Sequence, residues 1–303
     1  MAAFSKYFLK AIFFPLSKLP LKVLYAFSGF LAWVLGRLIG YRRADVLVNL
    51  SRAFPEKKYK EIKQLYKEYY RHMADIIVET IWFGGCRNPR RLRRARIMEV
   101  MNPEVLPAKG ENGPSAMILY SHCGNWELYG GIENYFNNTG DCPFTEQNFC
   151  VVYKKLSSAA WDEFLRDNRF APLHDRKNFP GYIESKNLVR HAFNNRDERK
   201  FYNINTDQRP YYGGSDTIEV EFMGQKCRTM SAAAAIARKF SMQLFFLRMS
   251  IAGRGHYRLE YVPICDDASK MSVQEIMDRY YQLLEAEIRE QPYNYLWSHR
   301  RWA

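Results

Sequence analysis

The chain has 303 residues and a formal net charge of +13, and 47% of its residues are hydrophobic and 16% aromatic. This length suits one large α/β domain with an appended segment. Nucleic acids and anionic membranes both attract basic proteins. The basic residues here are spread through the chain, with one concentration at residues 87–96, and no nucleic-acid module accompanies them. We therefore expect a membrane surface, and not nucleic acid, as the partner.

Apolar residues dominate residues 1–41, which we interpret as a membrane anchor preceding one domain at residues 42–303. The longest uncharged run, residues 23–36, has 14 residues, fewer than the roughly 20 that cross a bilayer core squarely. Lys22 at its start can snorkel toward lipid headgroups. The anchor is thus either a short span or a helix lying in the interface, and the basic cluster after it favours the cytoplasmic side. A buried pair of core helices is the alternative interpretation.

Beyond residue 42 the pattern predicts helices followed by an alternating α/β core. Apolar residues at three- and four-residue steps predict two amphipathic helices flanking Pro55. The remaining expected strands and helices alternate, which predicts a mixed, largely parallel central sheet covered by helices. The expected strands are at 116–120, 149–153, 201–205, 218–222, 244–249 and 257–262, and the expected helices at 157–167, 183–194, 230–240 and 271–289.

The six cysteines form no Cys-x-x-Cys pair and lack the dense spacing of a secreted disulfide scaffold. We interpret them as reduced thiols of a cytosolic compartment. The chain also contains no His-Glu-x-x-His helix and no clustered set of cysteines and histidines. We therefore predict no metal site and no cofactor.

The most informative run is Ser-His-Cys-Gly-Asn-Trp-Glu at residues 121–127, directly after the first expected strand. His122 and Glu127 are five apart, so on a continuous helix they point about 140° away from each other. They can cooperate only across a turn, with Asn125 as the N-cap of a helix that begins at Trp126. Glu127 would then accept a hydrogen bond from one imidazole nitrogen, leaving the other to remove a proton from a substrate hydroxyl. The alternative is that both are ordinary surface residues.

The run at residues 122–127 resembles the His-x4-Asp/Glu signature of glycerolipid and lipid A acyltransferases, within the lysophospholipid acyltransferase superfamily. Its Asn-Trp-Glu ending is similar to the branch that acylates lipid A precursors. Residues 42–56 and 75–80 resemble the opening of the late acyltransferases of lipid A biosynthesis, and the similarity extends to about Trp302. It implies an acyltransferase in which His122 is the general base and Glu127 orients it.

The resemblance also implies substrate-binding residues. Arg166 matches a functional arginine of the family, and a guanidinium can hold a phosphate in a bidentate way. Asp207 matches an acidic residue at a strand end, where sites of α/β sheets assemble. Asn125, Trp126 and Gln208 lie in the same matched motifs and are expected at the substrate. Lys154 stands where the family commonly has an arginine, and the loop at residues 209–214 is longer and more basic than the family's, so acceptor preference stays open.

The reaction implied by the resemblance is transfer of a fatty acyl chain from a thioester, usually of acyl carrier protein, to a hydroxyl of a lipid A precursor. The setting would be the cytoplasmic face of the bacterial inner membrane. A net charge of +13 suits an acidic carrier protein and an anionic membrane. A glycolipid, a lysophospholipid or an amino-acid lipid stays open as acceptor. A thioesterase or other hydrolase using the same His and Glu with water is a rival, as is a non-catalytic membrane scaffold.

Overall fold

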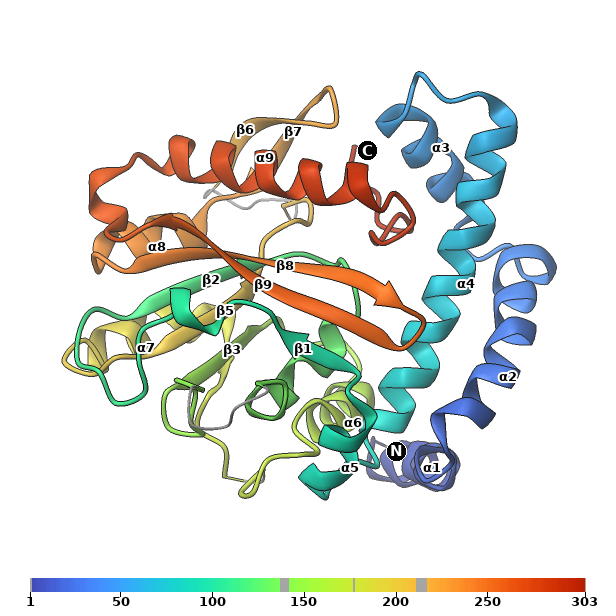
Figure 1. Cartoon of the computed structure of the whole chain (residues 1–303), viewed down its shortest axis with the longest axis horizontal. Helices are drawn as coiled ribbons and strands as arrows, with labels where there is room; N and C mark the ends of the chain where they lie inside the picture. The colour runs from blue at the N-terminus through green and yellow to red at the C-terminus, as the bar shows by residue number, and fades with distance from the viewer. Residues whose placement is uncertain (1, 137–141, 177, 211–216, 303) are drawn as a thin grey trace.

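The computed structural model describes residues 2–136, 142–176, 178–210 and 217–302. Its centre is a seven-stranded sheet in the order β1-β9-β8-β2-β5-β3-β4, with helices on both faces (Figure 1). Five neighbouring strands run parallel, and β9 is antiparallel to them. The predicted fold class, a mixed and largely parallel sheet covered by helices, is confirmed. The strands are β1 (Met98–Val100), β2 (Ala116–Tyr120), β3 (Phe149–Tyr153), β4 (Tyr182–Glu184), β5 (Phe201–Asn205), β8 (Gln243–Gly253) and β9 (His256–Cys265).

The helices differ in length and kind, and the longest, α4, has 25 residues. The α-helices are α1 (Ala2–Ser17), α2 (Leu21–Trp33), α3 (Arg43–Ala53), α4 (Tyr59–Phe83), α5 (Pro89–Ala95), α6 (Ala159–Arg169), α7 (Leu188–Asn194), α8 (Ala232–Lys239) and α9 (Val273–Glu290). Short 3-10 segments are η2 (Pro103–Val105), η3 (Trp126–Asn134), η4 (Ser185–Asn187) and η5 (Ala268–Lys270), and η1 (Val34–Leu38) is a π-helical turn that continues α2.

Side chains of the central strands alternate between two apolar cores, one on each face of the sheet. In β2, Met117 and Leu119 enter the core that contains α8 and α9, whereas Ile118 enters the core that contains η3 and α5. All five residues of β2 are buried. A parallel strand that is covered on both faces of the sheet carries apolar side chains on both faces. The sequence of β2 is therefore a continuous apolar run instead of an alternating one.

Several elements differ from the expectation. The run 218–222 forms β6 (Thr217–Phe222), but it pairs with β7 (Gln225–Met230) in a separate hairpin, outside the central sheet. The helix expected at 183–194 begins only at Leu188, because Ile183 is in β4 at the edge of the sheet. The short strands β1 and β7 were not expected, since three residues and a polar run give too little pattern to recognise.

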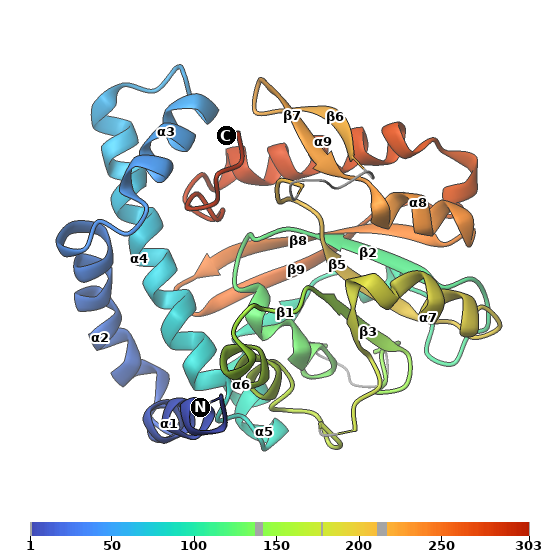
Figure 2. The ribbon, with the colours of Figure 1, turned by 180° about the vertical axis from the view of Figure 1, so that it is seen from behind.

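The apolar N-terminal segment lies along α4, as Figure 2 shows from behind. The stretch Leu21–Leu38 is long and apolar enough to cross a membrane by length and composition. Hydrogen bonds join it to α4 at both ends: the Tyr25 hydroxyl donates to Glu79 at 2.6 Å, and the Tyr66 hydroxyl donates to the carbonyl of Gly36 at 2.5 Å. The segment is therefore fixed to the domain, and the predicted boundary at residue 41 stays a prediction.

Glu287 in α9 provides a test of how the stability of the folded protein depends on pH. One carboxylate oxygen accepts a hydrogen bond from the backbone N–H of Met249 at 2.7 Å, and the other is buried without a hydrogen-bond partner among the described residues. Burial raises the pKa of Glu287 to about 8. Because this value lies above that of an unfolded glutamate, the folded state is favoured while the carboxyl is protonated, and this stability is lost as pH rises toward 8.

We expect Glu287→Gln to have a higher free energy of unfolding than the wild type at pH 8 and a flatter pH dependence between about pH 4.5 and 8. The amide keeps an acceptor for Met249 and never ionises. Urea unfolding in detergent at several pH values measures this, with the exposed Glu221→Gln as the matched control. An unchanged pH slope in Glu287→Gln would contradict the assignment.

Candidate active site

The pairing of β2 with β5 places the central residues of the site. The two strands are parallel and Tyr120 lies opposite Asn205. His122 and Asp207 each follow two residues later, so both leave the same edge of the sheet side by side. This edge faces α4 and the C-terminal segment, and carboxyl ends of parallel strands are where sites of α/β proteins form.

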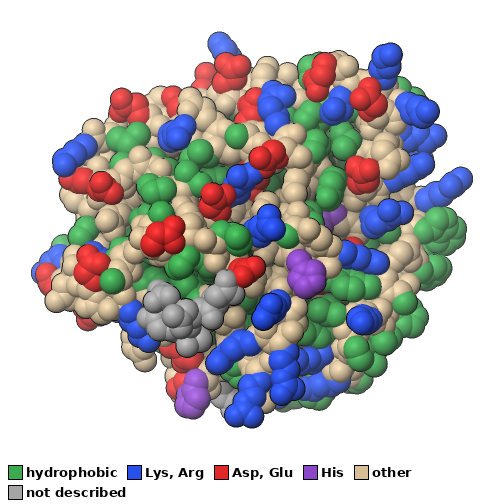
Figure 3. Space-filling model, in the orientation of Figure 1, with side chains coloured by type: hydrophobic (Ala, Val, Ile, Leu, Met, Phe, Trp, Pro, Cys, Tyr) green, Lys and Arg blue, Asp and Glu red, His purple; other side chains and the backbone are tan. Residues whose placement is uncertain are grey.

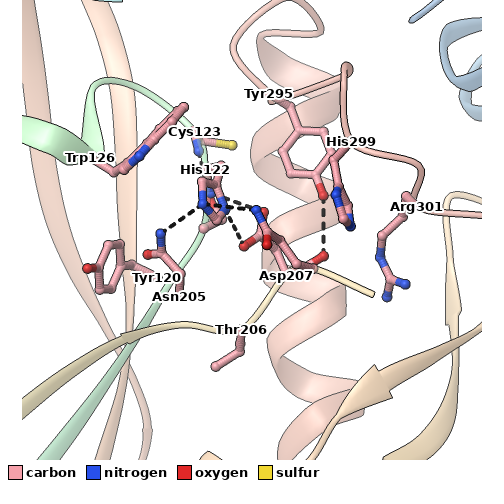
Figure 4. A network of polar contacts seen from close by, with 12 residues as sticks. Tyr120, His122, Cys123, Trp126, Asn205, Thr206, Asp207, Tyr295, His299 and Arg301 are labelled. Carbon is pink, nitrogen blue, oxygen red and sulfur yellow. Dashed lines mark hydrogen bonds and ion pairs between the residues drawn. The ribbon is translucent and has the colours of Figure 1, made fainter. Parts of the chain in front are cut away.

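Asp207 holds the imidazole of His122 (Figure 4). The Nδ1 atom of His122 lies 2.8 Å from Oδ1 of Asp207, and the backbone N–H of His122 donates to Oδ2 at 3.1 Å. The Asp207 side chain is 1% exposed and that of His122 13%. Burial by itself would raise the pKa of Asp207, but the charge and hydrogen bonds of His122 hold this pKa below its usual value. An ionised Asp207 accepts a hydrogen bond from Nδ1–H, which leaves the lone pair of Nε2 as the acceptor on the imidazole.

Amide and aromatic groups surround the other nitrogen. The side-chain nitrogens of Asn205 and Gln208 lie 3.1 and 3.2 Å from Nε2 of His122. The indole of Trp126 meets the imidazole edge to face, with ring centroids 4.7 Å apart. Gln208 and Trp126 were predicted to be near the substrate, and both contact the proposed base. Asn205, the last residue of β5, was missed.

The predicted hydrogen bond between His122 and Glu127 is wrong. Glu127 instead forms a two-pronged ion pair with Arg169 of α6, with N···O distances of 2.6 and 2.7 Å, and also accepts from the indole N–H of Trp126 at 3.2 Å. Burial alone would raise the pKa of Glu127, but Arg169 holds it below its usual value. The carboxylate that contacts His122 is therefore Asp207, which the sequence had suggested only as a substrate-binding residue.

Asn125 also departs from the prediction. The turn is followed by the 3-10 segment η3 instead of an α-helix, and the Asn125 side chain does not cap it. It is fully buried and donates to Glu79 at 2.8 Å and to the carbonyl of Ile76 at 3.3 Å. This burial is inconsistent with substrate contact, so Asn125 holds the turn in place.

A band of aromatic and cationic side chains continues from Glu127. Arg169 donates to the Tyr182 hydroxyl at 3.3 Å, and the Arg166 guanidinium lies over the Tyr182 ring at 5.6 Å. The family resemblance had suggested Arg166 as a substrate-binding residue. It had not suggested Arg169, which lies one helical turn later on the same face of α6. The spacing of three residues between the two arginines could have indicated that they share this face. Lys154 is exposed directly after β3, and residues 211–214 of the basic loop lie outside the described residues.

An apolar cavity of about 280 Å³ reaches the imidazole. His122 and Trp126 form one part of its wall. The rest comes from one face of α4, from the N-terminal segment and from the C-terminal segment. These wall residues are Leu35, Tyr41, Tyr69, His72, Met73, Ile76, Ile77, Asn294, Tyr295 and Leu296.

Within the described residues, no group of three or more His, Cys, Asp or Glu side chains is placed to hold a metal ion. Cys123, next to His122, is 1% exposed, and burial raises its pKa well above that of a free thiol. A protonated, buried thiol is a poor nucleophile. Cys123 is therefore a poor candidate for a nucleophile at this site.

The Glu127–Arg169 pair gives a prediction about the stability of the fold around the site. Glu127→Gln or Arg169→Gln alone should lower the free energy of unfolding by about 1 to 3 kcal/mol, because each leaves a largely buried charge without its partner. The double variant should recover part of this loss, as a double-mutant cycle by urea unfolding would measure. Glu184→Gln, in the more exposed pair with Lys186, serves as the control and should change little. Additive losses would contradict the pairing.

Comparison with known proteins identifies the family of this chain. The family model of the bacterial lipid A biosynthesis acyltransferases matches residues 2–303, which include the N-terminal helices, the His122 turn and the C-terminal segment. A search of curated proteins gave no match. Because the family match covers the entire described chain, the protein belongs to the bacterial lipid A biosynthesis acyltransferase family and is an acyltransferase.

Proposed function

We propose that this acyltransferase moves a fatty acyl chain from a thioester of acyl carrier protein to a hydroxyl group of a lipid A precursor at the cytoplasmic face of the bacterial inner membrane. The observation that carries the proposal is the imidazole of His122. Its Nδ1 atom is held by a buried aspartate, and its ring forms part of the wall of an apolar cavity. This is the arrangement that a general base acting on a lipid hydroxyl needs.

In the proposed reaction, Nε2 of His122 removes the hydroxyl proton of the acceptor while its oxygen attacks the thioester carbonyl carbon. The carbonyl oxygen becomes negatively charged in the tetrahedral intermediate. The C–S bond then breaks, the carbonyl re-forms as an ester, and the leaving thiolate takes the proton from the imidazolium. Asp207 stabilises that imidazolium, and the amide nitrogens of Asn205 and Gln208 are close enough to Nε2 to donate to an oxygen bound beside it.

The apolar lining of the cavity favours the proposal that the transferred group is a fatty acyl chain. Most of its wall is aliphatic or aromatic, and most of these side chains come from α4 and the C-terminal segment. Burying a chain in such a cavity stabilises the complex by about 0.8 kcal/mol per methylene relative to water. The chain can therefore be held with its carbonyl end at His122.

The position of Arg166 supports a phosphorylated substrate. Arg166 lies at the end of the band that runs from Trp126 through Glu127, Arg169 and Tyr182. The charge of Arg169 is compensated by Glu127, so Arg166 is the better candidate for a phosphate of the acceptor or of the donor's phosphopantetheine arm.

The surface of the N-terminal segment supports the membrane setting. Large apolar side chains of α1 and α2 face outward, with Phe27 61% and Phe30 67% exposed. Figure 3 shows hydrophobic side chains along the edge formed by α2, and lysines and arginines gathered below it near α1 and α5. Exposed basic residues there include Lys18, Arg87 and Arg90. Because α2 is fixed along a charged α4, we propose that it lies in the membrane interface with its apolar face in the lipid and its basic flank at anionic headgroups.

The role of Asp207 can be tested by Asp207→Asn. The amide keeps the size of the side chain but does not stabilise the imidazolium, so we expect kcat to fall on the order of 100-fold to 10,000-fold, with the KM of the donor changing little. Steady-state kinetics of acyl transfer measure this, with the exposed Asp266→Asn as the matched control. A value of kcat near that of the wild type would exclude Asp207 as the orienting acid.

The function itself is tested with purified protein in mixed micelles, acyl carrier protein bearing a radiolabelled acyl chain, and either a lipid A precursor or a lysophospholipid. We expect label in the lipid A precursor, and none with His122→Ala, whose folding is checked by circular dichroism. Label released as free fatty acid would instead indicate a hydrolase, and label in the lysophospholipid would overturn the proposed acceptor. Lipid mass spectrometry of a deletion strain should show lipid A lacking one acyl chain.

A further inference from the structure

A buried glutamate connects the membrane-facing helix with the turn that follows His122. Glu79 in α4 is 0% exposed and accepts hydrogen bonds from three different elements. The Tyr25 hydroxyl of α2 donates at 2.6 Å, the Tyr257 hydroxyl of β9 at 2.7 Å, and the Asn125 amide at 2.8 Å. Glu79 is thus a single point of contact between α2, the sheet and the catalytic turn.

A second set of contacts fixes α2 in the same place. The Arg254 guanidinium, in the turn between β8 and β9, pairs with Asp75 of α4 at 2.8 and 2.9 Å. It also donates to the carbonyl of Tyr25 at 3.1 Å, and the Ser28 hydroxyl donates to Asp75. Tyr25 and Ser28 therefore face inward from a mostly apolar helix and contact charged side chains of the domain.

The turn after His122 depends on the amide that Glu79 holds. Gly124 has a φ of +62°, and its N–H donates to the Asn294 side chain at 2.7 Å. Asn125 follows, with its amide nitrogen bonded to Glu79 and to the carbonyl of Ile76. These two asparagine contacts set the direction in which the chain passes from His122 to Trp126. A shift of Asn125 would move the indole that packs on the imidazole.

We propose that Glu79 is a positioning residue that couples the seating of α2 on α4 to the geometry of the His122 turn, so that acyl transfer is fully active only when α2 is docked. The inference rests on the proposed role of His122 as the base. It assigns the N-terminal segment a part in the reaction beyond attachment to the membrane.

The coupling has a simple electrostatic cause. Burial raises the pKa of Glu79 to about 7, against the three hydrogen bonds that favour its ionised form. The groups that face it are Tyr25, Asp75, Asn125, Tyr257 and, through Asp75, Arg254. If Tyr25 withdraws, the carboxylate loses one stabilising donor and takes up a proton more readily. Tyr25 donates to Oε1 of Glu79, whereas Asn125 donates to Oε2, so a proton on Oε1 leaves a neutral carboxyl that is a weaker acceptor for the Asn125 amide.

The test is Tyr25→Phe, which removes the hydroxyl and leaves the apolar face of α2 unchanged. We expect kcat at pH 7 to fall on the order of tenfold, the KM of the donor to stay the same, and most of the loss to be recovered at pH 8.5, where Glu79 ionises without Tyr25. Amide hydrogen exchange of residues 121–127 should become faster at pH 7. Sedimentation with phosphatidylglycerol vesicles should be unchanged, which separates positioning from attachment.

Two further variants complete the experiment. Glu79→Gln should show the lowered kcat and no recovery at pH 8.5, because the amide does not titrate, whereas Tyr59→Phe, an exposed tyrosine at the start of α4, should behave as wild type. Full kcat and unchanged exchange in both Tyr25→Phe and Glu79→Gln would overturn the proposal. If the wild type itself transfers no acyl chain, the proposed function fails, whereas the exchange of residues 121–127 still reports on the coupling.

Discussion

The parallel pairing of β2 with β5 is the constraint on which the site depends. It sets Tyr120 opposite Asn205, and the two residues that follow each partner bring His122 within 2.8 Å of Asp207. A register shift of one residue would turn every side chain of β2 to the other face of the sheet. The two apolar cores that hold β2 in register therefore also hold the imidazole, so packing of the sheet and the chemistry of the site share one cause.

The sequence predicted the elements well where their pattern was long or apolar. The central strands, the amphipathic helices and the turn at His122 are all present. Short or polar elements such as β1 and β7 were missed because three residues, or a run such as Gln225–Met230, carry little hydrophobic periodicity. The same pattern could not reveal that β6 leaves the central sheet, since its pairing partner lies in a run with no strand signal.

The structure brings several residues named from the sequence together in the candidate site, but their contacts differ from the predicted ones. Spacing along the chain suggested Glu127 as the partner of His122, because the two are near in sequence. The actual partner, Asp207, is 85 residues away and reaches His122 only through the order of strands in the sheet. Glu127 is instead neutralised by Arg169, whose position depends on how α6 packs. Neither strand order nor helix packing can be read from a local motif.

The cavity wall includes Leu35, which also belongs to the apolar segment that faces outward. An acyl chain bound in a cavity of about 280 Å³ contacts side chains that have little room to adjust. Each buried methylene adds about 0.8 kcal/mol only while the wall can accommodate it. Discrimination between chains of different length must therefore come from the shape of the cavity, where one methylene too many forces the side chains apart and one too few leaves a void.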